Sequence, residues 1–314
     1  MGAFFKFACA VVAPLLLFGC SVVPALQSAP GRYEVEHRRI KSESRDLQVT
    51  YVRPSERRPP AYCVVFVTGD GGWHGVSTDL FEHLAQQGYA IAGFSGREIV
   101  APMRRSGQRI PRAVAAERLA GAFTRARRAL GFADTTPMIV VGFSRGATIV
   151  AFAAVHPELH DGIAGAVAIS LTREADYLRA AEGDDRTPGI ELDSKGRIQI
   201  YPALKLFGAT RVAVIESTSD RYVPAAEARE LLGPDTATRR LFAVDAKNHR
   251  FRGGSEKLLH DVDAALEWIE SAGAAKSTAA AGSDEGAEES AAAAASDEAA
   301  AESAAPASDD VRRY

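Results

Sequence analysis

Short apolar runs alternate along the chain with longer segments in which apolar residues recur every three or four positions. Three runs are unbroken, Tyr62–Thr68, Tyr89–Ser95 and Met138–Phe143, and such runs are typical of strands that are buried on both faces. The longer segments predict helices, among them Arg112–Leu130 and Ser255–Ser271. Repeated strand–helix–strand units of this kind predict a mostly parallel sheet with helices on both faces.

The same patterns place the remaining elements in one domain, residues 33–272. Tyr33–Ile40 and Leu47–Arg53 alternate polar and apolar residues, which predicts an antiparallel pair at one edge of the sheet. Residues 171–208 lack a clear period, so they form either a short lid-like insertion or a plain connecting loop. Further strands are expected at Gly165–Ser170, Arg211–Ser217 and Arg240–Val244, and further helices at 77–87, Arg145–Val155 and Ala225–Leu232.

The first 19 residues differ from this domain. They carry one charge, Lys6, and an apolar run that is short for a membrane span, which predicts a bacterial export signal. The string Leu17-Phe18-Gly19-Cys20 resembles a lipobox, so we expect Cys20 to be lipidated and the protein to be a periplasmic, membrane-anchored lipoprotein. The alternatives are cleavage nearby without lipid and retention as an uncleaved anchor.

Two further segments have little to bury. Residues 20–32 are rich in Pro, Ser, Ala and Gly, which suits a tether, and residues 273–314 are rich in Ala, Ser and acidic residues, which predicts a disordered tail. Export places the chain in an oxidising compartment. Because lipidation occupies Cys20 and Cys9 leaves with the signal, Cys63 would have no partner, and no structural disulfide is expected.

Charge and motif content exclude several classes of function. The net charge of −3 gives no indication of a nucleic-acid partner. The sequence has no H-E-x-x-H motif and no cluster of Cys and His at metal-ligand spacing. We therefore expect no metal and no cofactor.

The strongest chemical signal is the string Gly142-Phe143-Ser144-Arg145-Gly146, which has the G-x-S-x-G spacing of a nucleophile elbow. An apolar strand precedes it and a helix-competent segment follows it, as the elbow requires. Glycines at the flanking positions let a strand turn abruptly into a helix with the serine at the apex. The pattern therefore predicts Ser144 as a catalytic nucleophile at the carboxyl edge of the sheet.

A serine hydroxyl needs an imidazole base, and the elbow fold orders its residues as Ser, acid, His. His249 lies in the loop between the last strand and the last helix, where the base belongs. His156 and His160 come too early in this order, and His260 falls inside the last helix. His249 is therefore the predicted base.

The acid is expected after the strand that precedes the last one. Asp220 leaves the strand Arg211–Ser217 and precedes a helix that Pro224 starts, so we predict Asp220 as the acid. Asp245 is the alternative, because it lies close to His249 in the sequence.

A glycine-rich loop, Gly69-Asp70-Gly71-Gly72-Trp73, follows the buried strand that ends at Thr68. In this fold the loop at this place supplies one amide of the oxyanion hole, and the residue after the nucleophile supplies the other. The predicted donors are therefore the amides of Gly71 and Arg145. Trp73 is predicted either as a wall of the substrate pocket or as part of the core.

Arginines crowd the region after the strand Tyr89–Ser95. Most of them fit the solvated face of a helix and its lead-in. Arg104 and Arg105 precede that helix, so they are also candidates to line the site and hold a phosphate group of the substrate.

Three strings together resemble the VirJ/AcvB family of exported bacterial proteins: Gly69–Trp73 (GDGGW), Gly142–Ala147 (GFSRGA) and Asn248–Gly254 (NHRFRGG). The resemblance implies an α/β-hydrolase fold and hydrolysis of lysyl-phosphatidylglycerol, an aminoacyl ester of a membrane lipid. It also implies that Ser144 is the nucleophile, Asp220 the acid and His249 the base. Asp70 then either pairs with the ammonium of the substrate or hydrogen-bonds its own loop.

The sequence thus predicts an exported serine hydrolase that cleaves an ester, its partners being a membrane lipid or another small ester. A generic carboxylesterase or lipase is the alternative within this class. A non-catalytic periplasmic binding or chaperone-like protein on the same scaffold is the alternative from another class, because a fold does not determine a function.

Overall fold

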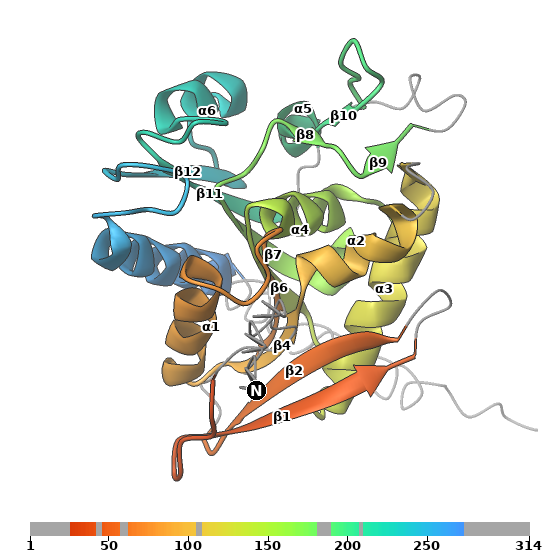
Figure 1. Ribbon diagram of the computed structural model, residues 1–314, viewed down its shortest axis with the longest axis vertical. Coiled ribbons are helices and arrows are strands. Elements are labelled where there is room, and N and C mark those ends of the chain that lie inside the picture. Colours follow the sequence, from red (N-terminus) through yellow and green to blue (C-terminus); the bar gives the residue numbers. More distant parts are fainter. Residues whose placement is uncertain are drawn as a thin grey trace, which may run out of the picture.

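An eight-stranded sheet crosses the centre of the protein (Figure 1). The computed structural model describes residues 26–41, 46–56, 62–104, 109–180, 190–206 and 210–272. The predicted export signal, Cys20, Arg105 and the predicted tail lie outside these ranges. In spatial order the strands are β1 (Tyr33–Ile40), β2 (Leu47–Pro54), β4 (Ala90–Phe94), β3 (Cys63–Val67), β6 (Met138–Phe143), β7 (Ile163–Ile169), β11 (Arg211–Ser217) and β12 (Arg239–Val244).

The sheet is parallel except at one edge. β1 pairs antiparallel with β2, and β2 pairs antiparallel with β4, whereas every pairing from β4 to β12 is parallel. The unbroken apolar runs in β3, β4 and β6 are buried throughout, because helices cover both faces of a parallel sheet. The predicted strand set and the antiparallel edge pair are therefore present.

Helices form a layer on each face of the sheet (Figure 1). One face packs against α1 (Val76–Gln86) and the last helix, residues 255–272. Side chains alternate along β3, so Val64 and Phe66 point to this layer while Val65 and Val67 point to the other. The second layer consists of α2 (Gly96–Arg104), α3 (Arg112–Ala129), α4 (Arg145–Val155), α5 (Ile200–Leu206) and α6 (Ala225–Leu232).

The region predicted as a lid or a loop holds short elements of its own. β8 (Glu174–Ala175) pairs with β10 (Ile198–Gln199), and β9 (Leu178–Arg179) pairs with β5 (Ile110–Pro111). α5 follows β10 directly. The described part of this insertion therefore packs on the domain beside α4 rather than forming a bare connection. A single 3-10 turn, η1 (His160–Gly162), precedes β7.

The end of the predicted tether also lies on the domain. Leu26 is buried in the same apolar cluster as Tyr33 and Tyr62, and Ala29 forms an isolated bridge with Tyr33. Of the helices in the described ranges, none combines the length and the apolar character needed to cross a bilayer.

The parallel arrangement brings six loops to one edge of the sheet. The strands β4, β3, β6, β7, β11 and β12 all end there, because parallel strands have their carboxyl ends on the same side. The turn from β6 to α4 lies directly against the end of β3. A methyl group on Gly146 would overlap the carbonyl oxygen of Val67, and one on Gly142 would overlap the carbonyl oxygen of Gly146.

This contact is between backbones, so it has no flexible side chain that could move aside. We predict that Gly146→Ala lowers the free energy of unfolding by at least about 1–3 kcal/mol, which urea denaturation would measure. Gly71→Ala is the matched control, because a methyl group there would meet nothing within 4 Å. Equal stability of the two variants would contradict the steric account.

Candidate active site

Ser144 occupies a strained turn at the carboxyl edge of the sheet. It joins β6 to α4 with φ 55° and ψ −117°, a backbone conformation that is rare for a residue with a side chain. The Ser144 amide donates to the carbonyl oxygen of Ile169 at 2.8 Å, which ties the turn to the end of β7. The side chain is thereby lifted out of both the strand and the helix, as an exposed nucleophile requires.

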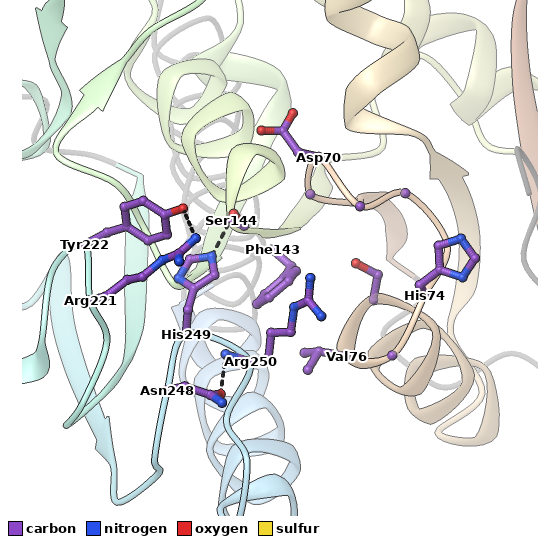
Figure 2. A pocket seen from close by; sticks show the side chains of 15 residues that line it. Asp70, His74, Val76, Phe143, Ser144, Arg221, Tyr222, Asn248, His249 and Arg250 are labelled. Atoms are coloured by element: carbon purple, nitrogen blue, oxygen red, sulfur yellow. Dashed lines mark hydrogen bonds between the residues drawn. The ribbon is translucent and has the colours of Figure 1, made fainter. Parts of the chain in front are cut away.

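Three side chains from three loops form one hydrogen-bonded series, and Figure 2 shows the contact between Ser144 and His249. His249 Nε2 lies 2.9 Å from Ser144 Oγ, and His249 Nδ1 lies 2.6 Å from Asp220 Oδ2. Asp220 is 4% exposed, and its second carboxylate oxygen accepts the amide of Tyr222 at 2.8 Å. The loops that follow β6, β11 and β12 thus bring together the three residues that the sequence predicts as nucleophile, acid and base.

The other candidates lie elsewhere. Asp245 is exposed at the end of β12, where its carboxylate accepts the Thr218 hydroxyl at 3.3 Å. His260 lies on the last helix with 75% of its side chain exposed, next to Asp261. Neither residue is part of the series around Ser144.

Several contacts that the sequence did not reveal hold the base in place. Ser170 donates its hydroxyl to the main-chain carbonyl of His249 at 3.0 Å. Asn248 Oδ1 accepts the amides of Arg250 and Arg252, which closes the loop around His249. The Tyr222 ring meets the imidazole edge-on, with 4.9 Å between the ring centroids. These contacts fix both the position and the plane of the imidazole.

The series lies on the wall of a cavity of about 770 Å³. The cavity is bounded by the glycine-rich loop on one side and by the loops of His249 and Tyr222 on the other (Figure 2). Its lining residues are Gly69, Asp70, Gly71, Gly72, His74, Gly75, Val76, Ser77, Phe143, Ser144, Arg221, Tyr222, Asn248, His249 and Arg250. Gly71, one of the two predicted oxyanion donors, is therefore on the cavity wall.

Arg145, the other predicted oxyanion donor, begins α4 directly after Ser144 and uses its side chain as a clamp. The guanidinium forms a two-bond contact with Asp70 and a second one with Asp176, which belongs to the insertion. Burial would lower the pKa of Arg145, but the hydrogen bonds that it donates to the two carboxylates raise the pKa above its ordinary value. One cation thus faces two carboxylates, and the group keeps an excess of one negative charge.

A second cavity, of about 550 Å³, adjoins the first one at Ser144. The two cavities share Ser144, Asp70, Arg221 and Tyr222 as lining residues. Arg145 and Asp176 line the second cavity but not the first, whereas His249 lines the first but not the second. The nucleophile therefore stands between two chambers of different composition.

One predicted substrate-binding residue lies away from these chambers. Trp73 is 4% exposed and packs between Phe66 and Phe81, with ring centroids 5.9 and 5.0 Å away, so it belongs to the core and not to the cavity wall. The predictions for the side chain of Arg104, at the end of α2, and for Arg105 lie outside what the structure describes.

Comparison with family models identifies the chain. Residues 61–232 match the model described as "VirJ: Bacterial virulence protein (VirJ)". The chain belongs to the VirJ family. A search of curated proteins gave no match for this VirJ-family chain.

Solved structures show the fold of the VirJ-family chain. Est1E from Butyrivibrio proteoclasticus aligns with a TM-score of 0.52 at 15% identity, over 74% of this chain and 99% of Est1E. An esterase from Pyrococcus furiosus aligns with a TM-score of 0.50 at 16% identity, over 76% and 93% of the two chains. An acylaminoacyl peptidase from Pyrococcus horikoshii aligns with a TM-score of 0.52 at 15% identity, over 76% of this chain and 41% of the peptidase. The predicted α/β-hydrolase fold is confirmed.

A buried carboxyl group lies just before the predicted acid of the VirJ-family site. Glu216 in β11 is fully buried, and its Oε1 accepts the amide of Leu171 at 2.7 Å. Its Oε2 has no hydrogen-bond partner among the described residues. Burial raises the pKa of Glu216 well above its ordinary value of 4.5, and the nearby charge of Asp220 raises it further. The raised pKa favours the protonated carboxyl group in the folded protein at pH values above 4.5, where the unfolded chain releases this proton.

This proton sets the direction of one pH effect on stability. Below pH 4.5 the carboxyl group of Glu216 is protonated in both the folded and the unfolded protein. Above pH 4.5 the unfolded chain releases this proton more readily than the folded protein does, so the free energy of unfolding of the wild type falls as pH rises. We predict that the free energy of unfolding of Glu216→Gln increases relative to that of the wild type as pH rises above 4.5, measured by urea denaturation from pH 4 to 9. A difference that stays constant over this range would mean that Glu216 does not take up a proton on folding.

Proposed function

We propose that the protein is a serine esterase that acts through Ser144, His249 and Asp220. The observation that carries the proposal is the continuous hydrogen-bonded series of these three side chains on a cavity wall. In the reaction, Ser144 Oγ attacks the ester carbonyl while His249 takes its proton. His249 then gives the proton to the leaving alcohol, and water repeats the sequence to release the acid. Asp220 holds the imidazole in the useful tautomer throughout.

The oxyanion of the tetrahedral intermediate needs hydrogen-bond donors that are already in place. We assign this role to the amides of Arg145 and Gly71. The clamp between Arg145 and Asp70 supports the assignment, since it joins the elbow to the glycine-rich loop. Each such donor typically contributes about 3–4 kcal/mol to the stabilisation of the transition state.

For the substrate we propose an aminoacyl ester of a membrane phospholipid similar to lysyl-phosphatidylglycerol. The resemblance that carries this activity rests on the GDGGW and elbow strings. The two carboxylates of Asp70 and Asp176 that share Arg145 also support it, because a local excess of carboxylates favours a cationic acyl group. Arg173 and Arg197 line the same cavity, but each of them has a carboxylate partner of its own.

We also propose that the protein is exported and held at a membrane by a lipid on Cys20, as the lipobox-like string suggests. A tethered enzyme meets membrane esters in two dimensions, which raises their effective concentration without additional contacts.

The triad can be tested by active-site labelling. We expect a fluorophosphonate probe to label the wild-type protein and not Ser144→Ala, because the probe needs an activated serine. His249→Gln and Asp220→Asn should lower ester turnover by about 10³–10⁴-fold, since the base is then lost or held in the wrong tautomer. Asp245→Asn is the matched control and should retain both labelling and turnover. A folded wild-type protein that resists the probe would favour a binding module over an enzyme.

The acyl preference can be tested with two phospholipid esters that differ only in the amino acid. We expect the wild type to cleave lysyl-phosphatidylglycerol in vesicles faster than the alanyl ester. Asp70→Asn removes the excess negative charge, so this preference should fall about three- to tenfold, measured as a ratio of kcat/KM values.

Asp79→Asn, a change at an exposed residue of α1, is the control for the acyl preference. An unchanged preference in Asp70→Asn would reject the cation contact, and turnover of many unrelated esters at similar rates would point to a generic carboxylesterase.

A further inference from the structure

Two arginines give the first cavity a charge that the catalytic series does not explain. Arg221 and Arg250 come from the loops after β11 and β12, and both line the cavity on either side of His249 (Figure 2). Neither guanidinium has a carboxylate partner among the described residues. The cavity is also lined by one carboxylate, Asp70, but both of its oxygens bind Arg145. Arg221 and Arg250 are thus its uncompensated charges.

Both arginines are exposed, and neighbouring residues hold the Arg221 side chain and the Arg250 backbone. The Arg221 guanidinium donates to the Tyr222 hydroxyl at 2.5 Å and lies over the Tyr222 ring, 4.7 Å from its centroid. The backbone of Arg250 is fixed by the bond from its amide to Asn248 Oδ1 at 2.9 Å. From there the side chain extends toward Val76 (Figure 2). Two guanidiniums that line one cavity are suited to oxygen anions such as phosphate.

The position of His249 tells which part of an ester would meet these arginines. His249 must reach the oxygen of the leaving alcohol in order to protonate it. Since His249 lines the first cavity and not the second, the alcohol part of the ester lies in the first cavity. The group beyond the alcohol oxygen is therefore the one that meets Arg221 and Arg250.

We propose that Arg221 and Arg250 form an anion subsite that binds a phosphate group carried by the alcohol part of the ester. This inference rests on the proposed esterase function and names a feature of its substrate. It places an anion of the substrate in the first cavity and, beyond Ser144, a cation beside Asp70 and Asp176. Arg250 lines only the first of the two cavities, whereas Arg221 lines both.

The test uses two soluble esters with the same acyl group, 1-butyrylglycerol and 1-butyrylglycerol 3-phosphate. We expect the wild type to have a higher kcat/KM for the phosphorylated ester. The ratio of the two kcat/KM values should fall about tenfold in Arg250→Gln or in Arg221→Gln, as is usual when one charge-assisted contact is lost. Arg250→Lys should restore part of the ratio, and Arg252→Gln, an exposed arginine of the same loop, should leave it at the wild-type value. A ratio that Arg250→Gln and Arg221→Gln both leave unchanged would overturn the subsite while the esterase stands.

A binding measurement separates the subsite from the catalytic proposal. The Ser144→Ala protein is titrated with sn-glycerol 3-phosphate in a calorimeter and mixed with vesicles of phosphatidylglycerol or phosphatidylcholine. Weaker binding of sn-glycerol 3-phosphate in Ser144→Ala/Arg250→Gln supports the subsite, even if the wild type cleaves neither ester and the esterase proposal fails. Arginine-dependent binding that is confined to phosphatidylglycerol vesicles also supports it and assigns the anion to a lipid headgroup. Equal binding with and without Arg250 in both assays would overturn it.

Discussion

The site depends on the contact between the backbone of the elbow and the end of β3. Because Gly146 touches the carbonyl oxygen of Val67, the strand that carries Ser144 and the strand that carries the glycine-rich loop have a set separation. The bond from the Ser144 amide to Ile169 fixes the elbow from the other side. The Ser144 hydroxyl is therefore held at a fixed position between the ends of β3 and β7. His249 and Asp220, in the loops after β12 and β11, form the hydrogen-bonded series with it at this position.

The charged groups around Ser144 are paired differently on its two sides, although Asp70 and Arg221 line both cavities. On the side of His249, two guanidiniums line the wall without carboxylate partners among the described residues. On the side of α4, one guanidinium is shared by two carboxylates. The two ends of a bound ester therefore meet different electrostatic potentials. Such an uneven distribution of charge favours one orientation of the substrate before Ser144 attacks.

Much of the fold and the catalytic series could be predicted from the sequence, because both depend on local patterns. Unbroken apolar runs indicate β3, β4 and β6, and the G-x-S-x-G spacing indicates the turn at Ser144. The known order of serine, acid and histidine along the chain then indicates Asp220 and His249, because each follows a predicted strand at the expected place. The helix α2 was not predicted, since Gly96 begins it and Pro102 lies within it, and both residues usually weaken a helix.

The surroundings of the series could not be predicted, because they arise from pairs that are far apart in the chain. Nothing near Arg145 in the sequence indicates that Asp70 and Asp176 converge on it. Trp73 shares a loop with Asp70, yet one side chain enters the core and the other faces the elbow. Arg221 and Arg250 likewise lie in loops, where no periodic pattern of apolar residues indicates which side chains line the same cavity. Only the packed structure reveals which polar residues share a wall.

The shared guanidinium has a consequence for how this family member can be altered. Positions 70, 145 and 176 come from three separate stretches of the chain, and the one guanidinium offsets part of the charge of the two carboxylates. A neutral residue in place of Arg145 would leave two anions facing each other across the entrance to the helix, and they would push the glycine-rich loop away from the insertion. Replacing the elbow by one from another hydrolase that lacks Arg145 would therefore require Asp70 and Asp176 to be replaced as well. The three residues have to be changed together.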